Sequence, residues 1–231
     1  MATEGNDMKD MAENMPPRHP AKYTDALLPV FARWCMESKS ILDPFAGTGK
    51  VGMLKDYGVR AVISANDIEK DWLTPNIYHC DKLYFQDAEF LDTGESYDTI
   101  VTSPTYGNRM ADHFHTEHPE RRATYTHCIG HELNDENTGR MHFGKAYCEK
   151  HRRIFAHLYD LLIDGGIFIL NCSNFVRAGE IVDVTSWMRD TMESVGFKFC
   201  SSVNVSTPRM RFGANSDKRV EYETVMLFHK G

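Results

Sequence analysis

Two short segments of the sequence combine residue types that can bind a cofactor and act on a flat, polar substrate. The first reads Asp-Pro-Phe-Ala-Gly-Thr-Gly, from Asp43 to Gly49, and lies between an apolar pair of strand type and a segment with helical spacing. Glycine lets the backbone approach a ligand closely, and the first turn of a helix offers amide N–H groups as donors. This segment therefore predicts a binding site for a nucleotide-like cofactor.

The glycine pattern by itself leaves more than one interpretation open. A Walker phosphate loop is excluded because Pro44 and Val51 stand where that loop needs Gly and Ser or Thr. The dinucleotide pattern GxGxxG is present over residues 47–52, and Asp67 follows its first glycine by 20 residues, as a ribose-binding acid should. NAD binding and a tight turn of purely structural use both remain open at this point.

The second segment is Ser103-Pro104-Thr105-Tyr106, which follows the apolar run 99–102. A site that methylates the exocyclic amino group of a base must hold the flat base by stacking while acceptors take its N–H hydrogens. The Ser103 hydroxyl, the Pro104 carbonyl and the Tyr106 ring are suited to these roles. The segment therefore favours methyl transfer to an amino nitrogen.

As a set, these motifs resemble the amino-methyltransferases of DNA that use S-adenosyl-L-methionine and that bacteria and phages encode. That family carries a DPFxGxG turn and an (Asp/Asn/Ser)-Pro-Pro-Tyr motif, and the resemblance covers about residues 19–229. It implies a site-specific enzyme that methylates cytosine N4 or adenine N6 in DNA, as in restriction-modification. Thr105 departs from the usual Pro, and Ser103 at the first motif position is more typical of the cytosine N4 enzymes.

The resemblance also implies a role for each matching position. The segment that begins at His19 would contact the methionine part of the cofactor, Asp67 the ribose and Asp87 the adenine. The implied cofactor-binding residues are His19, Pro20, Ala21, Lys22, Tyr23, Asp43, Pro44, Phe45, Ala46, Gly47, Thr48, Gly49, Asp67, Ile68, Asp87 and Ala88. The implied catalytic residues are Ser103, Pro104, Thr105 and Tyr106.

A cytosine C5 methyltransferase is excluded by its covalent chemistry. Such an enzyme attacks ring carbon 6 with a Cys that follows a Pro in its catalytic motif. The chain contains no Pro-Cys pair.

The surrounding sequence alternates between apolar strand patterns and helical patterns. Helices are predicted over about 25–37, 51–57, 147–162 and 181–195, and strands over 41–42, 61–65, 83–87, 99–103, 167–170, 197–205 and 222–229. Such alternation indicates a mainly parallel sheet covered on both faces, with ligands at the carboxyl ends of its strands. We therefore expect an α/β fold of seven strands with helices on both faces and a terminal antiparallel hairpin. The resemblance implies that this is the Rossmann-like sheet of a class I methyltransferase.

A polar insertion over about 107–145 follows the second motif. Residues 107–153 hold seven of the eleven histidines, together with eight Lys or Arg and seven Asp or Glu. The hypothesis is a lid that contacts nucleic acid through Asn108, Arg109, Arg121, Arg122 and Tyr125. A solvated loop and a zinc site are the alternatives, the latter at His113, His115 and His118 or at His127 with His131; no metal is predicted, because no spacing matches a common finger.

A second basic segment lies between the last two strands. Residues 207–219 carry four basic side chains and one acid, a net charge of +3 in an acidic chain. Arg209 and Arg211 are the predicted phosphate contacts, and a solvated hairpin is the alternative. Asn171, after the fifth strand, is expected at the same sheet edge as the two motifs, although Asn there is as often a turn former.

Composition sets the outer bounds. The chain has 231 residues, 42% hydrophobic and 26% charged, with a net charge of −7, which fits one domain over 19–231 and a flexible arm over 1–18. No apolar run resembles a membrane span or a signal peptide, and six Cys without a CxxC pair fit reduced thiols, so a cytoplasmic location is expected. DNA is the expected partner; RNA, an NAD oxidoreductase and an inactive DNA-binding relative remain alternatives, and the oligomeric state is open.

Overall fold

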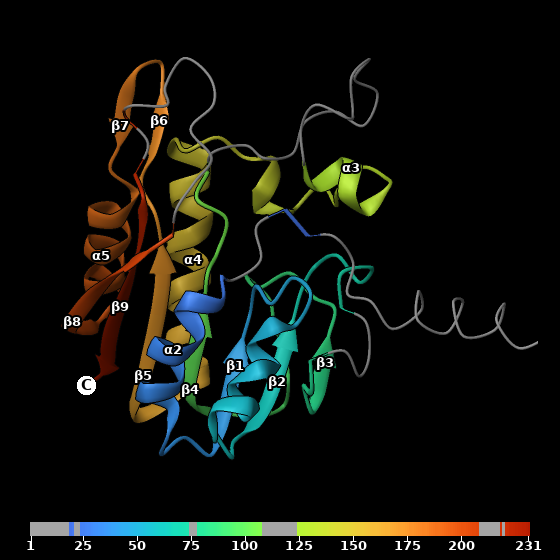
Figure 1. Cartoon of the computed structure of the whole chain (residues 1–231), viewed down its shortest axis with the longest axis vertical. Helices are drawn as coiled ribbons and strands as arrows, with labels where there is room; N and C mark the ends of the chain where they lie inside the picture. The colour runs from blue at the N-terminus through green and yellow to red at the C-terminus, as the bar shows by residue number, and fades with distance from the viewer. Residues whose placement is uncertain (1–18, 21–23, 74–77, 108–123, 208–217, 219) are drawn as a thin grey trace, which may run out of the picture.

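A single mixed sheet organises the chain (Figure 1). The computed structural model describes residues 19–20, 24–73, 78–107, 124–207, 218 and 220–231. Its seven strands lie in the order β3-β2-β1-β4-β5-β9-β8. Their bounds are β1 Ser40–Asp43, β2 Val62–Asn66, β3 Lys82–Tyr84, β4 Tyr97–Thr102, β5 Leu162–Cys172, β8 Phe197–Ser206 and β9 Tyr222–Lys230.

The direction of the strands determines where the site can be. Strands β3, β2, β1, β4 and β5 run parallel to one another, so their carboxyl ends meet at one edge of the sheet. Strand β9 is antiparallel to both β5 and β8. The predicted seven-stranded sheet and its terminal antiparallel pair are confirmed, with β9 placed inside and β8 at the edge.

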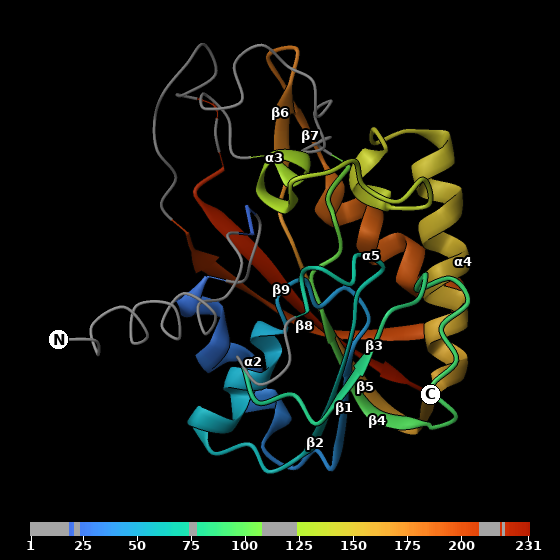
Figure 2. The ribbon, with the colours of Figure 1, turned by 90° about the vertical axis from the view of Figure 1, so that its right-hand side faces the viewer.

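Helices cover both faces of the sheet, and Figure 2 shows α2 on one side and α4 on the other. The first face carries η1 Asp25–Leu27, α2 Leu28–Cys35 and the 3-10 helix η2 Lys50–Tyr57; the second carries α4 Lys145–Leu161 and α5 Val184–Val195. Neighbouring residues of one strand serve the two faces: Ile41 belongs to the first core and Leu42 to the second. Burial on both faces explains why these strands are almost continuously apolar.

Three local predictions need correction. The fourth predicted helix begins at Val184, because Ile181 lies in β7 Glu180–Val182, which pairs with β6 Phe175–Arg177, and Asp183 caps the helix through the Ser186 amide (3.1 Å). The fifth predicted strand, 167–170, is longer than predicted, because β5 already pairs with β4 at Leu162. The third strand is shorter than predicted and ends at Tyr84.

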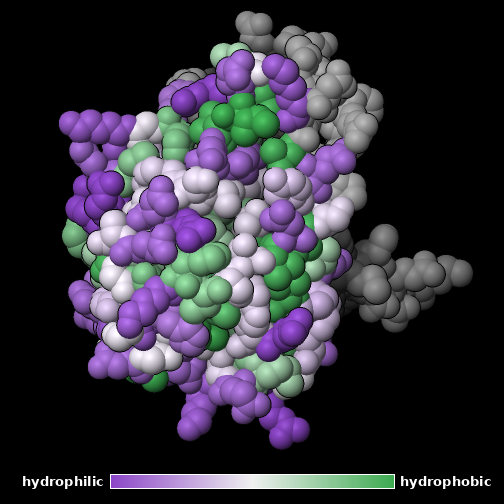
Figure 3. Space-filling view, turned by 90° about the vertical axis from the view of Figure 1, so that its left-hand side faces the viewer, coloured by the Kyte–Doolittle hydropathy of each residue, from purple (hydrophilic) through white to green (hydrophobic). Residues whose placement is uncertain are grey.

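The face in Figure 3 carries mostly hydrophilic side chains, and the hydrophobic ones gather in small separate groups. Strand β8 lies at the sheet edge, with most of its residues exposed, and its central residues include Ser201, Ser202 and Asn204. A polar edge of this kind resists pairing with other chains. Over the residues that the structure describes, no helix is both long enough and apolar enough to cross a membrane.

Gly52, the third glycine of the GxGxxG pattern, is required by packing. A Cβ at this position would lie 1.4 Å from the carbonyl oxygen and 2.5 Å from the carbonyl carbon of Tyr78. Only glycine lets η2 approach the backbone that leads into β3 this closely. The structural interpretation therefore holds for this one glycine of the pattern.

Replacement of Gly52 tests this packing. We expect Gly52→Ala to lower the free energy of unfolding by about 3 kcal/mol, or roughly 6–12 °C in Tm, because backbone must move to admit the methyl group. The matched control is Gly144→Ala, whose Cβ would meet no atom closer than 3.9 Å. Calorimetric Tm values for both variants measure the difference, and equal values would contradict the packing role.

Candidate functional site

The carboxyl ends of three strands are joined by the side chain of Asn66, the last residue of β2. Its Nδ2 donates to the carbonyl oxygens of Pro44 (3.1 Å) and Gln86 (2.9 Å), and its Oδ1 accepts from the Gln86 amide (2.9 Å). Pro44 follows β1 and Gln86 follows β3. One buried amide therefore holds the chain segments after β1 and β3 at a constant distance from β2.

Asp43 makes the corresponding connection from β1 to β4. Its carboxylate is fully buried and accepts hydrogen bonds from the Thr102 hydroxyl (2.8 Å) and the Phe45 amide (3.1 Å). Thr102 is the residue before Ser103, so this bond places the glycine turn beside the Ser-Pro-Thr-Tyr segment. The two motifs, about 60 residues apart in the chain, meet at one edge.

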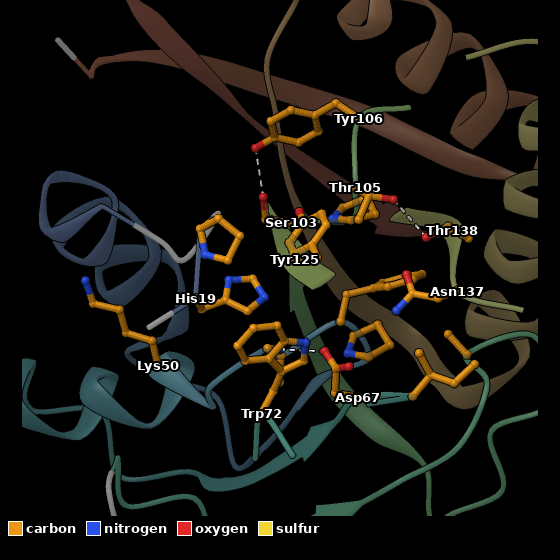
Figure 4. A pocket seen from close by; sticks show the side chains of 18 of the residues that line it. His19, Lys50, Asp67, Trp72, Ser103, Thr105, Tyr106, Tyr125, Asn137 and Thr138 are labelled. Carbon is orange, nitrogen blue, oxygen red and sulfur yellow. Dashed lines mark hydrogen bonds between the residues drawn. The ribbon is translucent and has the colours of Figure 1, made fainter. Parts of the chain in front are cut away.

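A cavity of about 390 Å³ opens at this edge (Figure 4). Fourteen of the sequence-predicted site residues line it, namely His19, Pro20, Pro44, Phe45, Ala46, Gly47, Asp67, Ile68, Asp87, Ala88, Ser103, Pro104, Thr105 and Tyr106. This volume lies in the range of cavities that enclose a cofactor or a small ligand. The predicted cofactor-binding and catalytic segments thus share one chamber.

Other predicted residues lie elsewhere. Asp43, Thr48 and Gly49 are buried and do not line the cavity; the Asp43 carboxylate is used within the sheet edge, and the Gly49 carbonyl accepts from the Cys80 thiol (3.2 Å). Ala21, Lys22, Tyr23, Asn108, Arg109, Arg121, Arg122, Arg209 and Arg211 lie outside the described residues, as do the arm over 1–18 and His113, His115 and His118.

Asp67 presents a half-buried carboxylate at the cavity wall. Its Oδ2 accepts from the Gly47 amide (2.8 Å) and its Oδ1 from the Glu69 amide (2.9 Å). Burial raises the pKa of this carboxyl to about 7, outweighing the two amide hydrogen bonds, which lower the pKa. Asp67 therefore titrates near neutral pH, where a ligand with hydroxyl donors would favour its ionised form.

Asp87, which lines the cavity, is held by Lys150 of α4. The ammonium group is 3% exposed and donates to Asp87 Oδ2 (2.8 Å) and to Glu136 Oε2 (2.7 Å). Burial lowers the pKa of Lys150, but the hydrogen bonds and charges of Asp87 and Glu136 raise it by more. The pKa is therefore raised overall, and the group stays charged. Lys150 thereby links α4, the segment after β3 and the insertion.

The insertion is anchored to the cavity by a second acid. Glu69 is buried, and its Oε1 accepts from the Asn134 amide (2.6 Å) and from Asn137 Nδ2 (2.8 Å). Asn137 and Thr138 both line the cavity, and Thr138 begins the short 3-10 helix η4 Thr138–Arg140. The described end of the insertion therefore forms a wall of the chamber.

Thr105, which departs from the family motif, bonds directly to this wall. Its hydroxyl lies 2.8 Å from the Thr138 hydroxyl, and the Tyr147 hydroxyl donates to its carbonyl oxygen. A proline at this position would lack the hydroxyl. The substitution therefore adds a contact between the motif and the insertion.

At the opposite end of the chamber, four polar side chains converge from three strand ends. Ser103 Oγ lies 2.9 Å from the Tyr106 hydroxyl, which donates to Glu223 Oε2 (3.2 Å). Asn171 Nδ2, from β5, lies within hydrogen-bond distance of all three. Burial, together with the nearby Glu223 charge, raises the pKa of the Tyr106 hydroxyl well above its ordinary value, so Tyr106 remains a phenol at neutral pH.

Three aromatic rings that line the cavity lie close together. The His19 ring lies 4.5 Å from the Trp72 ring and 5.4 Å from the Tyr125 ring, between centroids. A Cβ on Gly47, whose φ is +54°, would come within 3.2 Å of His19 Nε2. Glycine at this point lets the turn and the His19 ring lie against each other.

Sequence reasoning missed a further set of lining residues. These are Thr24, Lys50, Trp72, Gln86, Glu136, Asn137, Thr138, Thr207 and Glu223. The sequence did single out Tyr125, which lines the cavity as part of the proposed lid, and Asn171, which follows the core of the fifth predicted strand and bonds to the lining residue Ser103. His127 and His131, considered as zinc ligands, bond to Thr124 (2.7 Å) and Asp71 (2.9 Å), and no metal-binding group of His, Cys, Asp and Glu occurs among the described residues.

Comparison with known proteins identifies the fold. No protein-family model and no curated protein sequence matches the chain. TrmN from Thermus thermophilus resembles it with a TM-score of 0.55 and 12% identity over 96% of this chain and 52% of TrmN. The glycopeptide N-methyltransferase MtfA, in complex with S-adenosyl-L-methionine, resembles it with a TM-score of 0.52 and 14% identity over 93% of this chain and 98% of MtfA.

An S-adenosylmethionine-dependent methyltransferase from Clostridium acetobutylicum resembles the chain over 99% of its length and 100% of that protein, with a TM-score of 0.52 and 13% identity. The chain thus spans about half the length of TrmN and nearly all of the other two proteins. Identities this low establish the fold alone. The chain has the class I Rossmann-like methyltransferase fold.

The link made by Lys150 yields a stability prediction. We expect Lys150→Met to lower the free energy of unfolding by about 3 kcal/mol, because it leaves the Asp87 carboxylate, 17% exposed, without its cation. Lys145→Met, on the same helix with an 89% exposed side chain, should change it by less than about 0.5 kcal/mol. Urea unfolding of both variants measures the difference. A Lys150→Met protein as stable as the wild type would show that the ion pair does not stabilise the fold.

Proposed function

We propose that the chain is an S-adenosyl-L-methionine-dependent methyltransferase that methylates an exocyclic amino group, cytosine N4 or adenine N6, of a base in DNA. The observation that carries this proposal is the single chamber that Gly47, Asp67 and Asp87 share with Ser103 and Tyr106. A methyl donor and its acceptor must meet within one enclosed space for direct transfer. The three neighbouring structures and their shared fold support methyl transfer as the reaction class.

The charge of the chamber supports a cationic cofactor. Among the described lining residues, the acidic side chains are Asp67, Asp87, Glu136 and Glu223. Lys150 pairs with Asp87 and Glu136, and the lining Lys50 pairs with Asp25 (2.5 Å), so acidic groups still outnumber ammonium groups in and beside the described part of the chamber. S-adenosyl-L-methionine brings a sulfonium and an ammonium, whereas NAD brings a pyrophosphate that these carboxylates would repel. The antiparallel β9 also departs from the all-parallel sheet of the dinucleotide fold, which further disfavours NAD.

The described residues fit the parts of this cofactor. Asp67 would accept hydrogen bonds from the two ribose hydroxyls, and the backbone at Gly47 would lie against the nucleoside. Ile68 and Ala88 provide apolar surface for the adenine beside Asp87. When bound, the cofactor supplies a methyl group activated by its sulfonium charge.

The substrate end of the chamber would hold the base. The Tyr106 ring would stack on an extruded base, while Ser103 Oγ and the Pro104 carbonyl accept hydrogen bonds from the amino group and direct its lone pair at the methyl carbon. Transfer would then be direct and in line. This assignment of the roles rests on the motif and on the place of these residues in the cavity.

The two segments that hold the proposed nucleic-acid contacts are connected to described residues that line the cavity. Residues 108–123, with Asn108, Arg109, Arg121 and Arg122, connect Tyr106-Gly107 to Thr124-Tyr125, and Tyr106 and Tyr125 line the chamber. Residues 208–217, with Arg209 and Arg211, follow the lining residue Thr207. Both segments are therefore attached where a bound duplex would have to approach.

Cofactor binding should depend on pH through Asp67. Because its pKa is raised to about 7, the carboxylate is mostly protonated at pH 6 and mostly ionised at pH 8, and only the ionised form can accept from both ribose hydroxyls. We expect the Kd of S-adenosylhomocysteine, measured by calorimetry, to fall about tenfold from pH 6 to pH 8. Asp67→Asn should weaken binding and remove this dependence.

The matched control is Asp164→Asn, whose side chain is 93% exposed, and it should bind like the wild-type protein at both pH values. If Asp67→Asn keeps the full pH dependence, the ribose is not held by this carboxylate.

The reaction is tested by nucleoside mass spectrometry. The protein with S-adenosyl-L-methionine is incubated with amplified, unmodified bacterial genomic DNA or with RNA transcribed from it. We expect N4-methylcytosine or N6-methyladenine in the DNA. Methylation of the RNA alone would replace DNA as the substrate, and no product in either pool would contradict the proposal.

Tyr106→Ala separates the two ends of the chamber in the same assay. It should bind S-adenosylhomocysteine within about twofold of the wild-type Kd and lower the single-turnover rate by at least about tenfold, because stacking contributes about 1–3 kcal/mol. An unchanged rate at saturating cofactor would show that the base is held elsewhere.

A further inference from the structure

The hydrogen bonds at the substrate end of the chamber have a definite direction. The Tyr106 hydroxyl donates to Glu223 Oε2, so the Ser103 hydroxyl supplies the hydrogen in the 2.9 Å contact between Ser103 and Tyr106. The three side chains thus form a continuous series of hydrogen bonds from Ser103 through Tyr106 to the Glu223 carboxylate. Each hydroxyl in it accepts on one side and donates on the other.

Asn171 holds this direction. Its Nδ2 lies 3.1 Å from Ser103 Oγ, 3.1 Å from the Tyr106 hydroxyl and 2.5 Å from Glu223 Oε2. Because this amide has two N–H hydrogens and the Tyr106 oxygen already accepts from Ser103, the two hydrogens are assigned to Ser103 and Glu223. Asn171 Oδ1 is buried and has no hydrogen-bond partner among the described residues. A buried oxygen without a hydrogen-bond partner costs free energy. The hydrogen bonds that Asn171 Nδ2 donates must offset this cost, and they hold the side chain in its orientation.

Among the described residues, Ser103 keeps one acceptor position free in this arrangement. Its oxygen accepts from Asn171 and donates to Tyr106, and its remaining lone pair is available on the side of the cavity that Ser103 lines. An amino N–H of a base held there would donate to that lone pair. The amino hydrogen would then be the first donor in a series of hydrogen bonds that ends at the Glu223 carboxylate.

We propose that Glu223 is the final acceptor of the proton that leaves the amino nitrogen on methylation, and that the proton reaches it through Ser103 and Tyr106. This inference rests on the proposed function. The S–CH₃ bond breaks and the N–CH₃ bond forms; the nitrogen gives its proton to Ser103 Oγ, Ser103 gives its own to Tyr106, and Tyr106 gives its own to Glu223. The sulfonium becomes a neutral thioether and the carboxylate becomes a neutral acid, so charge balances.

The neighbouring groups explain why the proton would travel to Glu223. A serine hydroxyl is too weak a base to retain a proton, and the Tyr106 phenol is already protonated, so each can only pass one on. Glu223 is half-buried and lines the cavity, from which its proton can return to water. Because Glu223 acts through two other side chains, it is a positioning and relay residue of the site.

Single-turnover methylation of the amplified genomic DNA at saturating cofactor tests the relay. Glu223→Gln and Tyr106→Phe should each lower the rate by about 10²-fold, a typical contribution of general base catalysis, and the double variant should be no slower than either single one. All three should bind S-adenosylhomocysteine within about twofold of the wild-type Kd. The matched control Glu221→Gln, at an exposed position two residues away, should keep the wild-type rate.

Chemical rescue distinguishes proton acceptance from a structural role. In Glu223→Gly, added formate supplies a carboxylate, and the rate should rise with formate concentration, whereas chloride at equal ionic strength should have no effect. A wild-type rate in Glu223→Gln, additive losses in the double variant or no rescue by formate would overturn the relay and leave the proposed function standing. A wild-type protein that binds S-adenosylhomocysteine but methylates no DNA would overturn both.

Discussion

The site depends on buried polar side chains that hold the carboxyl edge of the sheet together. Asn66 ties the segments after β1 and β3 to β2, and Asp43 ties β1 to the end of β4 through Thr102. A buried amide or carboxylate is costly unless it is hydrogen-bonded, so these side chains favour one arrangement of the strand ends. The glycine turn, Asp67 and Ser103 take their relative positions from that arrangement.

The antiparallel β9 brings the end of the chain into this edge. A strand that runs opposite to its neighbours begins where they end, so Glu223, the second residue of β9, lies beside the carboxyl end of β5. There it meets Asn171 and Tyr106, which precedes it by 117 residues. The terminal hairpin that completes the sheet therefore also completes the polar cluster at its edge.

The insertion forms a wall of the same chamber through ion pairs and hydrogen bonds to the sheet edge. Lys150 and Glu69 bind Glu136, Asn134 and Asn137 from it. The Thr105 hydroxyl, at the position where the related motif has Pro, reaches Thr138. The described part of the insertion is thus coupled to Asp87 through Lys150 and to the Ser-Pro-Thr-Tyr segment through Thr105.

The sequence by itself determined the alternation of strands and helices, the sheet class and the two motifs, because periodicity and short patterns such as 43–49 and 103–106 are local properties of the chain. It did not indicate the shortness of β3, the hairpin of β6 and β7, or the buried role of Asp43. Only the tertiary structure showed that Glu223, Lys150 and Thr138 belong to the site. Their contacts arise between strand ends and helices remote in sequence, and no local pattern records which distant side chain meets them.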